Sequence, residues 1–154
     1  MLTGTLRLLV LYSWVGLTIC LLVHVASFLI LLPGGTLLLA GLSFGVFPPF
    51  AILVRLDLDA MQRVTASVEV ERHDLFERVF PCCPPPIRKF VRWLWLYAAV
   101  ATFVFLPIAA ISHDAASPVT LGAADLRAFS AALLFFYGAA LAGATSAYYA
   151  AKTA

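Results

Sequence analysis

The amino-acid sequence predicts an all-α integral membrane protein with four transmembrane helices, arranged as two antiparallel hairpins. Of its 154 residues, 63% are hydrophobic and 12% are charged, and the mean hydropathy is +1.00. Soluble domains carry about 25% charged residues. The charges are also unevenly spread, because residues 55–92 hold seven of the ten Lys/Arg and six of the eight Asp/Glu. The rest of the chain is a series of long apolar runs.

The first hairpin is expected from two apolar runs separated by a short turn. Residues 6–32 form the first span, which exceeds the ~18 apolar residues typical of a transmembrane helix. This run is also longer than the apolar part of a cleavable signal peptide, so we expect a retained anchor. Proline and glycines at 33–35 end it. The second span covers residues 36–54, and Pro48 and Pro49 predict a kink near its end.

Residues 55–89 form the polar connection between the hairpins, which we call the elbow. Charged pairs at i,i+4 spacing favour helix within it. An apolar stripe predicts a short amphipathic helix that rests on lipid or on the bundle; its members are Leu75, Phe76, Val79 and Phe80. Prolines at 81 and 84–86 are expected to end this helix and to force an extended connection.

The second hairpin comprises spans at residues 90–111 and 127–151, joined by an outer loop at 112–126. Trp93, Trp95 and Tyr97 open the third span, and aromatic residues of this kind gather at headgroup level. Pro107 predicts a bend near its far end.

Charge asymmetry predicts the orientation in the membrane. Arg7, Lys152 and the 55–92 segment lie on one side and together hold nine Lys/Arg, whereas the other side holds Arg127. Basic residues favour the cytoplasmic side. We therefore expect both termini and the elbow to be cytoplasmic, in a bacterial inner (plasma) membrane or an equivalent compartment.

Small residues at helical spacing predict where the helices pack, because helix association in lipid depends on close approach. The expected packing residues are Ser13, Gly16, Cys20 and Ser27 in the first span, Gly41 and Gly45 in the second, and Ala139 and Gly143 in the fourth. The fourth span has two faces of interest, this small-residue face and an opposite one with Ser130, Tyr137 and Tyr148. One is expected to pack in the bundle and the other to meet a partner chain or a second copy.

His24 continues the small and polar stripe of the first span and is the histidine at membrane depth. Counted from the expected helix ends, His24, Thr102 and Tyr137 lie roughly 13–15 Å below the outer surface and form one polar layer. We expect His24 to face protein with Thr102 or Tyr137 as a neighbour. A histidine at this depth serves as interhelical hydrogen-bonding glue, as part of a proton pathway, or as a ligand of haem b.

Catalytic chemistry is not indicated by any motif. The sequence lacks the common hydrolase, metalloprotease and nucleotide-binding signatures. Three cysteines without CxxC spacing predict neither a zinc site nor a redox pair. Arg88, Lys89 and Arg92 are expected at anionic lipid headgroups. Acidic residues in the same segment offset this charge, which argues against nucleic acid as a partner.

These observations favour a non-catalytic four-span subunit that packs into a larger membrane complex and stabilises it. Its partners are then the bilayer and other subunits, or further copies of itself. Two alternatives stay open: a homo-oligomeric channel or pore, and a haem-binding electron-transfer subunit that uses His24. Haem ligation by two histidines would need a second His24 or another subunit.

Overall fold

A computed structural model describes residues 2–29, 37–48, 51–52, 75–112 and 123–153, and its secondary structure is helical. The elements are α1 (Leu2–Leu29), a helix at Leu37–Pro48, α3 (Leu75–Val79), α4 (Pro85–Ser112) and α5 (Ala123–Thr153). Three of them contain stretches long and apolar enough to cross a membrane: Gly4–Leu29, Pro85–Ile111 and Ala123–Lys152. The predicted class, a helical membrane protein, agrees with this architecture.

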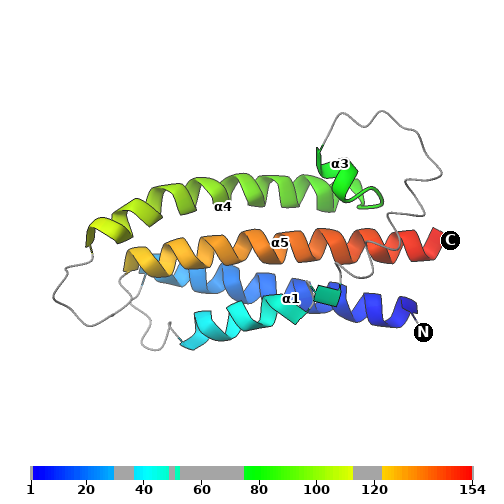
Figure 1. Cartoon of the computed structure of the whole chain (residues 1–154), viewed down its shortest axis with the longest axis horizontal. Coiled ribbons are helices and arrows are strands. Elements are labelled where there is room, and N and C mark those ends of the chain that lie inside the picture. The colour runs from blue at the N-terminus through cyan, green and yellow to red at the C-terminus, as the bar shows by residue number, and fades with distance from the viewer. Residues whose placement is uncertain (1, 30–36, 49–50, 53–74, 113–122, 154) are drawn as a thin grey trace.

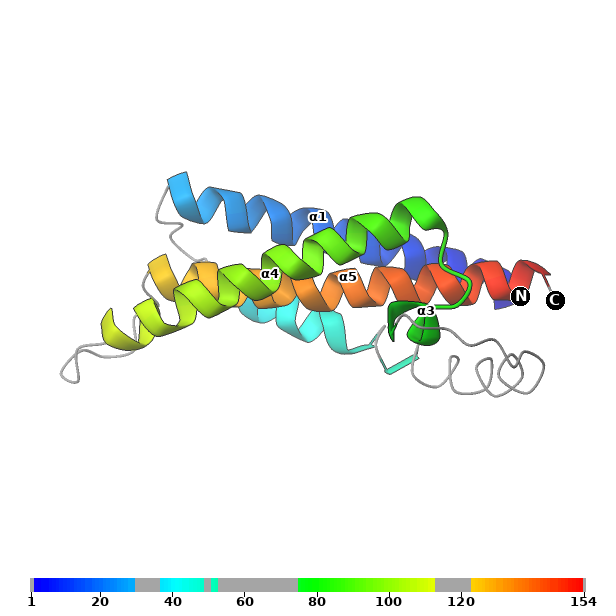
Figure 2. The same ribbon diagram turned by 90° about the horizontal axis from the view of Figure 1, so that it is seen from above.

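The central element is α5, with α1 and α4 packed along it (Figure 1). In the most apolar 18 residues of each helix, 78% of α5 is buried, against 39% of α1 and 17% of α4. Figure 2 shows α4 crossing over α5 while α1 runs beside it, with both chain termini and α3 at the same end of the bundle. The core of the protein therefore follows α5.

Both the small-residue face of α5 and the opposite face contain side chains that are buried inside the bundle. The expected small-residue face, with Ala139 and Gly143, is buried. Ser130 and Tyr137, on the opposite face, are also buried. Alanine dominates this helix, and its small side chain lets the neighbouring helices approach on several sides.

Two helices, α4 and α5, begin earlier in the sequence than predicted. The α4 helix begins at Pro85, five residues before the predicted start at Phe90. Pro85 and Pro86 lie in its first turn, where a helix has unpaired N–H groups and proline costs nothing. The expected extended connection is therefore helix from Pro85 onward. Likewise α5 begins at Ala123, so residues 123–126 are helix rather than outer loop.

The second predicted span, 36–54, is described in part. Its helix runs over Leu37–Pro48 and is linked to α1 by the hydrogen bond from Tyr12 to the Gly45 carbonyl. Twelve residues rise about 18 Å, whereas a bilayer core is about 30 Å thick. The end of the first span (30–32), the turn at 33–35, Pro49, residues 53–74 of the elbow and residues 113–122 of the outer loop lie outside the described residues.

The aromatic stripe of α3 rests on the bundle. Phe76 and Phe80 are buried, and their ring centroids lie 5.3 and 6.1 Å from that of Trp95 on α4. Trp95 in turn stacks on Phe135 of α5 at 4.8 Å and donates its indole N–H to the Phe135 carbonyl. Val79 stays exposed. Of the two surfaces expected for this stripe, lipid or bundle, the structure shows the bundle for both phenylalanines.

Candidate functional site

His24 forms hydrogen bonds with two other helices. Its imidazole is 1% exposed. Nδ1 lies 2.8 Å from Ser130 Oγ on α5, and Nε2 lies 2.7 Å from the Tyr97 hydroxyl on α4. One side chain of α1 therefore links all three long helices at a buried point.

The hydrogen-bond pattern identifies the tautomer. The Ser130 hydroxyl donates its proton to the Leu126 carbonyl at 2.6 Å, so Oγ accepts from His24. Nδ1 then carries the proton, and Nε2 accepts from the Tyr97 hydroxyl. The chain of donors runs from Tyr97 through His24 and Ser130 to Leu126. Each of its members is satisfied with a neutral imidazole, which suits a water-poor interior.

Arg127 secures the same end of α1. Its Nε and one terminal nitrogen donate to the Ser27 carbonyl at 3.3 and 3.2 Å. Ser27 lies in the last turn of α1, where carbonyls have no partner within the helix and attract a cation. The guanidinium also lies 4.6 Å from the Phe28 ring centroid and 5.6 Å from that of Phe105. This basic residue at the predicted outer end therefore tethers α5 to both α1 and α4.

The expected neighbours of His24 differ from the observed ones. Ser130 and Tyr97 take the places suggested for Tyr137 and Thr102. Depth was counted from Pro33 and Arg127. Tyr137 lies seven residues beyond Ser130 and is therefore about 10 Å deeper along α5. Thr102 is half-buried on α4.

Tyr137 instead forms a second contact point, at the level of Gly16. A Cβ built on Gly16 would lie 2.0 Å from the Tyr137 ring, so the ring packs directly on the α1 backbone. The Tyr137 hydroxyl donates to the Leu42 carbonyl at 3.1 Å, and Tyr12 donates to the Gly45 carbonyl at 2.8 Å. Two tyrosines thus hold the Leu37–Pro48 helix against α1 and α5.

The predicted packing residues fall into two groups. Ser13, Gly16, Cys20, His24 and Ser27 of the α1 stripe are all buried, as are Ala139 and Gly143 of α5. Gly45 packs under the tyrosine hydroxyls, but Gly41 is exposed and nothing lies within 4 Å of a Cβ built on it. The GxxxG pair therefore has one member inside the protein and one facing out.

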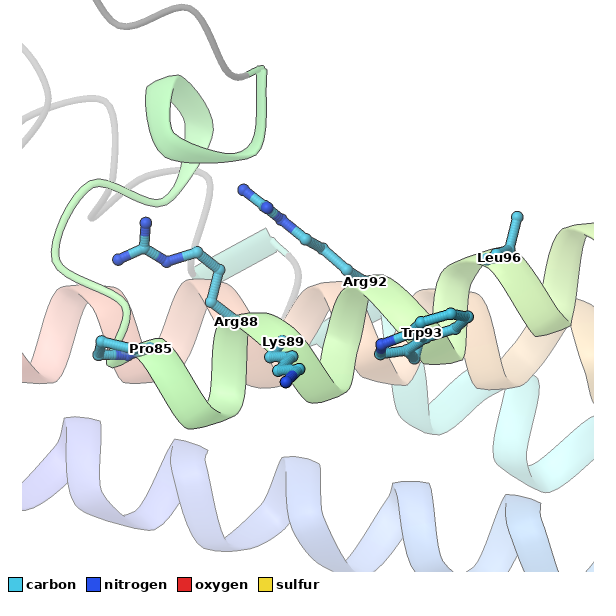
Figure 3. Close-up of a pocket in the computed structure, with 6 residues that line it drawn as sticks. All are labelled: Pro85, Arg88, Lys89, Arg92, Trp93 and Leu96. Carbon is cyan, nitrogen blue, oxygen red and sulfur yellow. The ribbon is translucent and has the colours of Figure 1, made fainter.

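Arg88, Lys89 and Arg92 lie together on the first turns of α4. Arg88 forms an ion pair with Glu77 of α3 and donates to the Cys83 carbonyl. The Arg92 guanidinium lies 5.3 Å from the Phe76 ring centroid. These residues line an open pocket of about 600 Å³ together with Pro85, Trp93 and Leu96 (Figure 3).

The cysteines are free thiols in the described structure. Burial raises the pKa of the Cys83 thiol to about 11, although the nearby Arg88 works in the opposite direction. Cys83 is therefore protonated and unreactive at neutral pH. Cys82 is half-buried, and its backbone N–H donates to Ser146 Oγ at 3.2 Å. No cluster of three metal-ligating side chains occurs among the described residues.

Sequence reasoning missed Tyr97, Ser130 and Arg127 as partners of the His24 region. Tyr97 was assigned to an aromatic belt at the opposite membrane surface because the third span was expected to begin at Phe90. Ser130 could have been predicted, because a serine near the start of the fourth span lies at the depth of His24.

Comparison of the chain with protein-family models, curated proteins and solved structures produced no match.

Proposed function

We propose that this chain is a non-catalytic, four-span membrane subunit that packs into a larger membrane complex and stabilises it. The observation that carries the proposal is the engagement of His24. Both ring nitrogens are hydrogen-bonded within the chain, so the ionisable group at membrane depth acts as a tie between helices. Such a tie contributes to packing without chemistry of its own.

The outer surface of the bundle supports the same proposal. Large apolar side chains cover the outward faces of α1 and α4, among them Leu8, Leu22, Phe103 and Ile111. These faces fit lipid tails and the helices of neighbouring subunits equally well, while the polar groups are turned inward.

The proposed topology has four spans with both termini cytoplasmic, in the inner membrane of a bacterium. It is supported by the position of both chain termini and α3 at one end of the bundle (Figure 2). Basic residues gather at that end on Arg7, Lys152 and the start of α4, whereas Arg127 marks the other. The Leu37–Pro48 helix would complete the second crossing together with residues outside the described structure.

A pore between copies is less well supported. The stripe of α1 that a water-filled path would need is buried against α5 of the same chain, with Ser13, Cys20 and His24 almost without exposure. Liposome flux measurements test this alternative, and ion conductance that depends on the chain would favour it.

Haem ligation through His24 has a similar obstacle. Iron would have to displace Tyr97 from Nε2 or Ser130 from Nδ1, since both nitrogens already have partners. A Soret band from the purified chain would favour this alternative.

The subunit proposal is tested by blue-native electrophoresis of membranes solubilised in a mild detergent. The chain should migrate well above its 16.6 kDa, together with other membrane proteins at a fixed ratio. Migration as a lone chain at several detergent concentrations would contradict it. An unrelated four-span protein of similar size, expressed to the same level, controls for non-specific association.

A further inference from the structure

Two consecutive prolines deprive the Gly45 carbonyl of its usual hydrogen-bond donors. A carbonyl in an α-helix accepts from the amide four residues ahead, or from the amide three residues ahead in the tighter 3₁₀ turn. For Gly45 these residues are Pro49 and Pro48, and proline has no backbone N–H. The covalent structure of the chain therefore leaves this carbonyl without a regular donor.

The carbonyls on either side of Gly45 are less affected. Phe44 has proline four residues ahead, but Phe47, three residues ahead, carries an amide. Val46 has proline three residues ahead, but Phe50, four residues ahead, carries an amide. In this helix the proline pair thus removes both regular donors from Gly45 and from no neighbouring carbonyl.

Tyr12 of α1 contacts the carbonyl that the prolines leave without a donor. Its hydroxyl donates to the Gly45 carbonyl at 2.8 Å. The absence of a side chain at Gly45 makes this approach possible, since a Cβ built there would lie 2.9 Å from the Tyr12 hydroxyl oxygen. Tyr12 belongs to the apolar stretch Gly4–Leu29, where no water can replace a missing donor.

Tyr137 makes a hydrogen bond of a different kind to the same helix. It donates to the Leu42 carbonyl at 3.1 Å. Four residues ahead of Leu42 is Val46, which carries an amide, and both residues lie within the described helix. The Tyr137 hydroxyl therefore adds to a regular helical position, whereas the Tyr12 hydroxyl serves a carbonyl that has no regular donor.

We propose that the Tyr12 hydroxyl replaces the amide donor that the two prolines lack, and that α1 thereby fixes the helix end at Gly45. The carbonyl is bonded to another helix instead of its own, so the two helices are coupled where the second is weakest. Loss of this bond would let the helix end move away from α1. The proline pair is then a hinge that one side chain of α1 holds in place. This inference is independent of the proposed role as a subunit.

The test is a double-mutant cycle on the full-length protein, unfolded in mixed micelles with increasing sodium dodecyl sulfate. Tyr12→Phe should raise the unfolding equilibrium constant about tenfold, because the Gly45 carbonyl loses its donor. Pro49→Ala supplies an amide four residues beyond Gly45. In that background Tyr12→Phe should raise the constant by about threefold or less. Equal effects of Tyr12→Phe in both backgrounds would overturn the proposal.

Tyr137→Phe is the matched control for the cycle. It removes a tyrosine hydroxyl from the same helix, but the Leu42 carbonyl keeps its amide donor. Its effect should therefore be the same with proline or alanine at position 49. A dependence on Pro49→Ala as large as that of Tyr12→Phe would show a general loosening of the helix and would contradict the specific replacement.

A spectroscopic measurement follows the Gly45 carbonyl directly and does not depend on reversible unfolding. Gly45 and Val46 form the single Gly-Val pair in the sequence, so ¹³C-carbonyl glycine with ¹⁵N-valine gives one cross-peak. A carbonyl carbon that loses a hydrogen bond is shielded, so Tyr12→Phe should move this resonance upfield and Tyr137→Phe should move it less. An unmoved resonance in the Tyr12→Phe protein would overturn the proposal.

Discussion

Gly16 is the residue at which α1 makes room for the Tyr137 ring. We predict that Gly16→Ala destabilises the folded protein by about 1–3 kcal/mol, because the added methyl group would lie 2.0 Å from a ring carbon. Gly41→Ala is the matched control: it has open space at its Cβ and should be neutral or slightly stabilising. Unfolding in mixed micelles with increasing sodium dodecyl sulfate measures both. Equal effects of the two substitutions would contradict the ring-on-backbone contact.

His24 of α1 is hydrogen-bonded to both α4 and α5, so its loss should weaken the packing of three helices. We predict that His24→Ala lowers the free energy of unfolding by about 1–3 kcal/mol, from two interhelical hydrogen bonds of about 0.6 kcal/mol each and a buried cavity. Val25→Ala, at an exposed neighbour on α1, should cost much less. Both are measured by the same detergent titration. If the two variants were equally stable, the hydrogen bonds of His24 would not contribute to the stability of the bundle.

Single residues also show where sequence reasoning succeeds and where it stops. Burial of His24 was predicted from its place in a small and polar stripe, because lipid is a poor environment for imidazole. Its partners were not predicted, since they depend on helix register. Counting depth from Pro33 and Arg127 displaced the fourth span by about two turns relative to α1, which substituted Tyr137 for Ser130.

At the scale of elements, α3 owes its position to two buried rings. A five-residue helix is too short to be stable alone, so contacts of Phe76 and Phe80 with Trp95 must hold it. We predict that Phe76→Ala releases α3 and speeds proteolysis in this segment several-fold, with little change in the melting of the long helices. Val79→Ala, on the exposed side of the same helix, is the control. Unchanged proteolysis of the Phe76 variant would contradict the docking.

Cys83, in the connection between α3 and α4, should react with alkylating reagents in a pH-dependent way. With its pKa raised to about 11 from 9.0, the Cys83 thiol should alkylate at least about 100-fold more slowly at pH 8 in the folded protein than in the unfolded chain. The rate should rise as the pH approaches 11, and the folded state should lose stability above pH 9 because ionisation favours unfolding. Mass spectrometry after maleimide treatment resolves Cys82 from Cys83. Equal folded and unfolded rates for Cys83 would contradict its burial.

The elements also show why the predicted ends shifted. Proline was treated as a helix terminator before the third span, but at the first turn of a helix it is favoured, and Pro85 and Pro86 begin α4. The alanine-rich composition of the fourth span left open which helices pack against it. One face of the fourth span was identified as small and the opposite face as carrying Ser130, Tyr137 and Tyr148, yet composition alone cannot tell whether a neighbouring helix belongs to the same chain or to a partner. In the structure α1 and α4 pack along α5, while Phe129, Phe136 and Tyr149 of α5 are exposed.

At the scale of the whole molecule, the described residues form a bundle organised on α5, with Ser13, His24 and Ser130 buried and large apolar side chains on the outer faces of α1 and α4. Helical class and membrane character were predictable, because hydropathy and the absence of charge over about 20 residues dictate them. The order of helices around α5 was not predictable, since small-residue faces permit several arrangements. We propose that a bundle of this kind acts as a stabilising subunit rather than as a pore or an electron carrier.

The most direct measurement of that role is the abundance of other membrane proteins after deletion of this chain. The account predicts that a small set of membrane proteins, those that comigrate with the chain, falls several-fold in abundance while their transcripts stay constant. Re-expression of the wild-type chain should restore them, and Gly16→Ala should restore them less well than Gly41→Ala. Unchanged abundance of every comigrating protein would contradict a stabilising subunit.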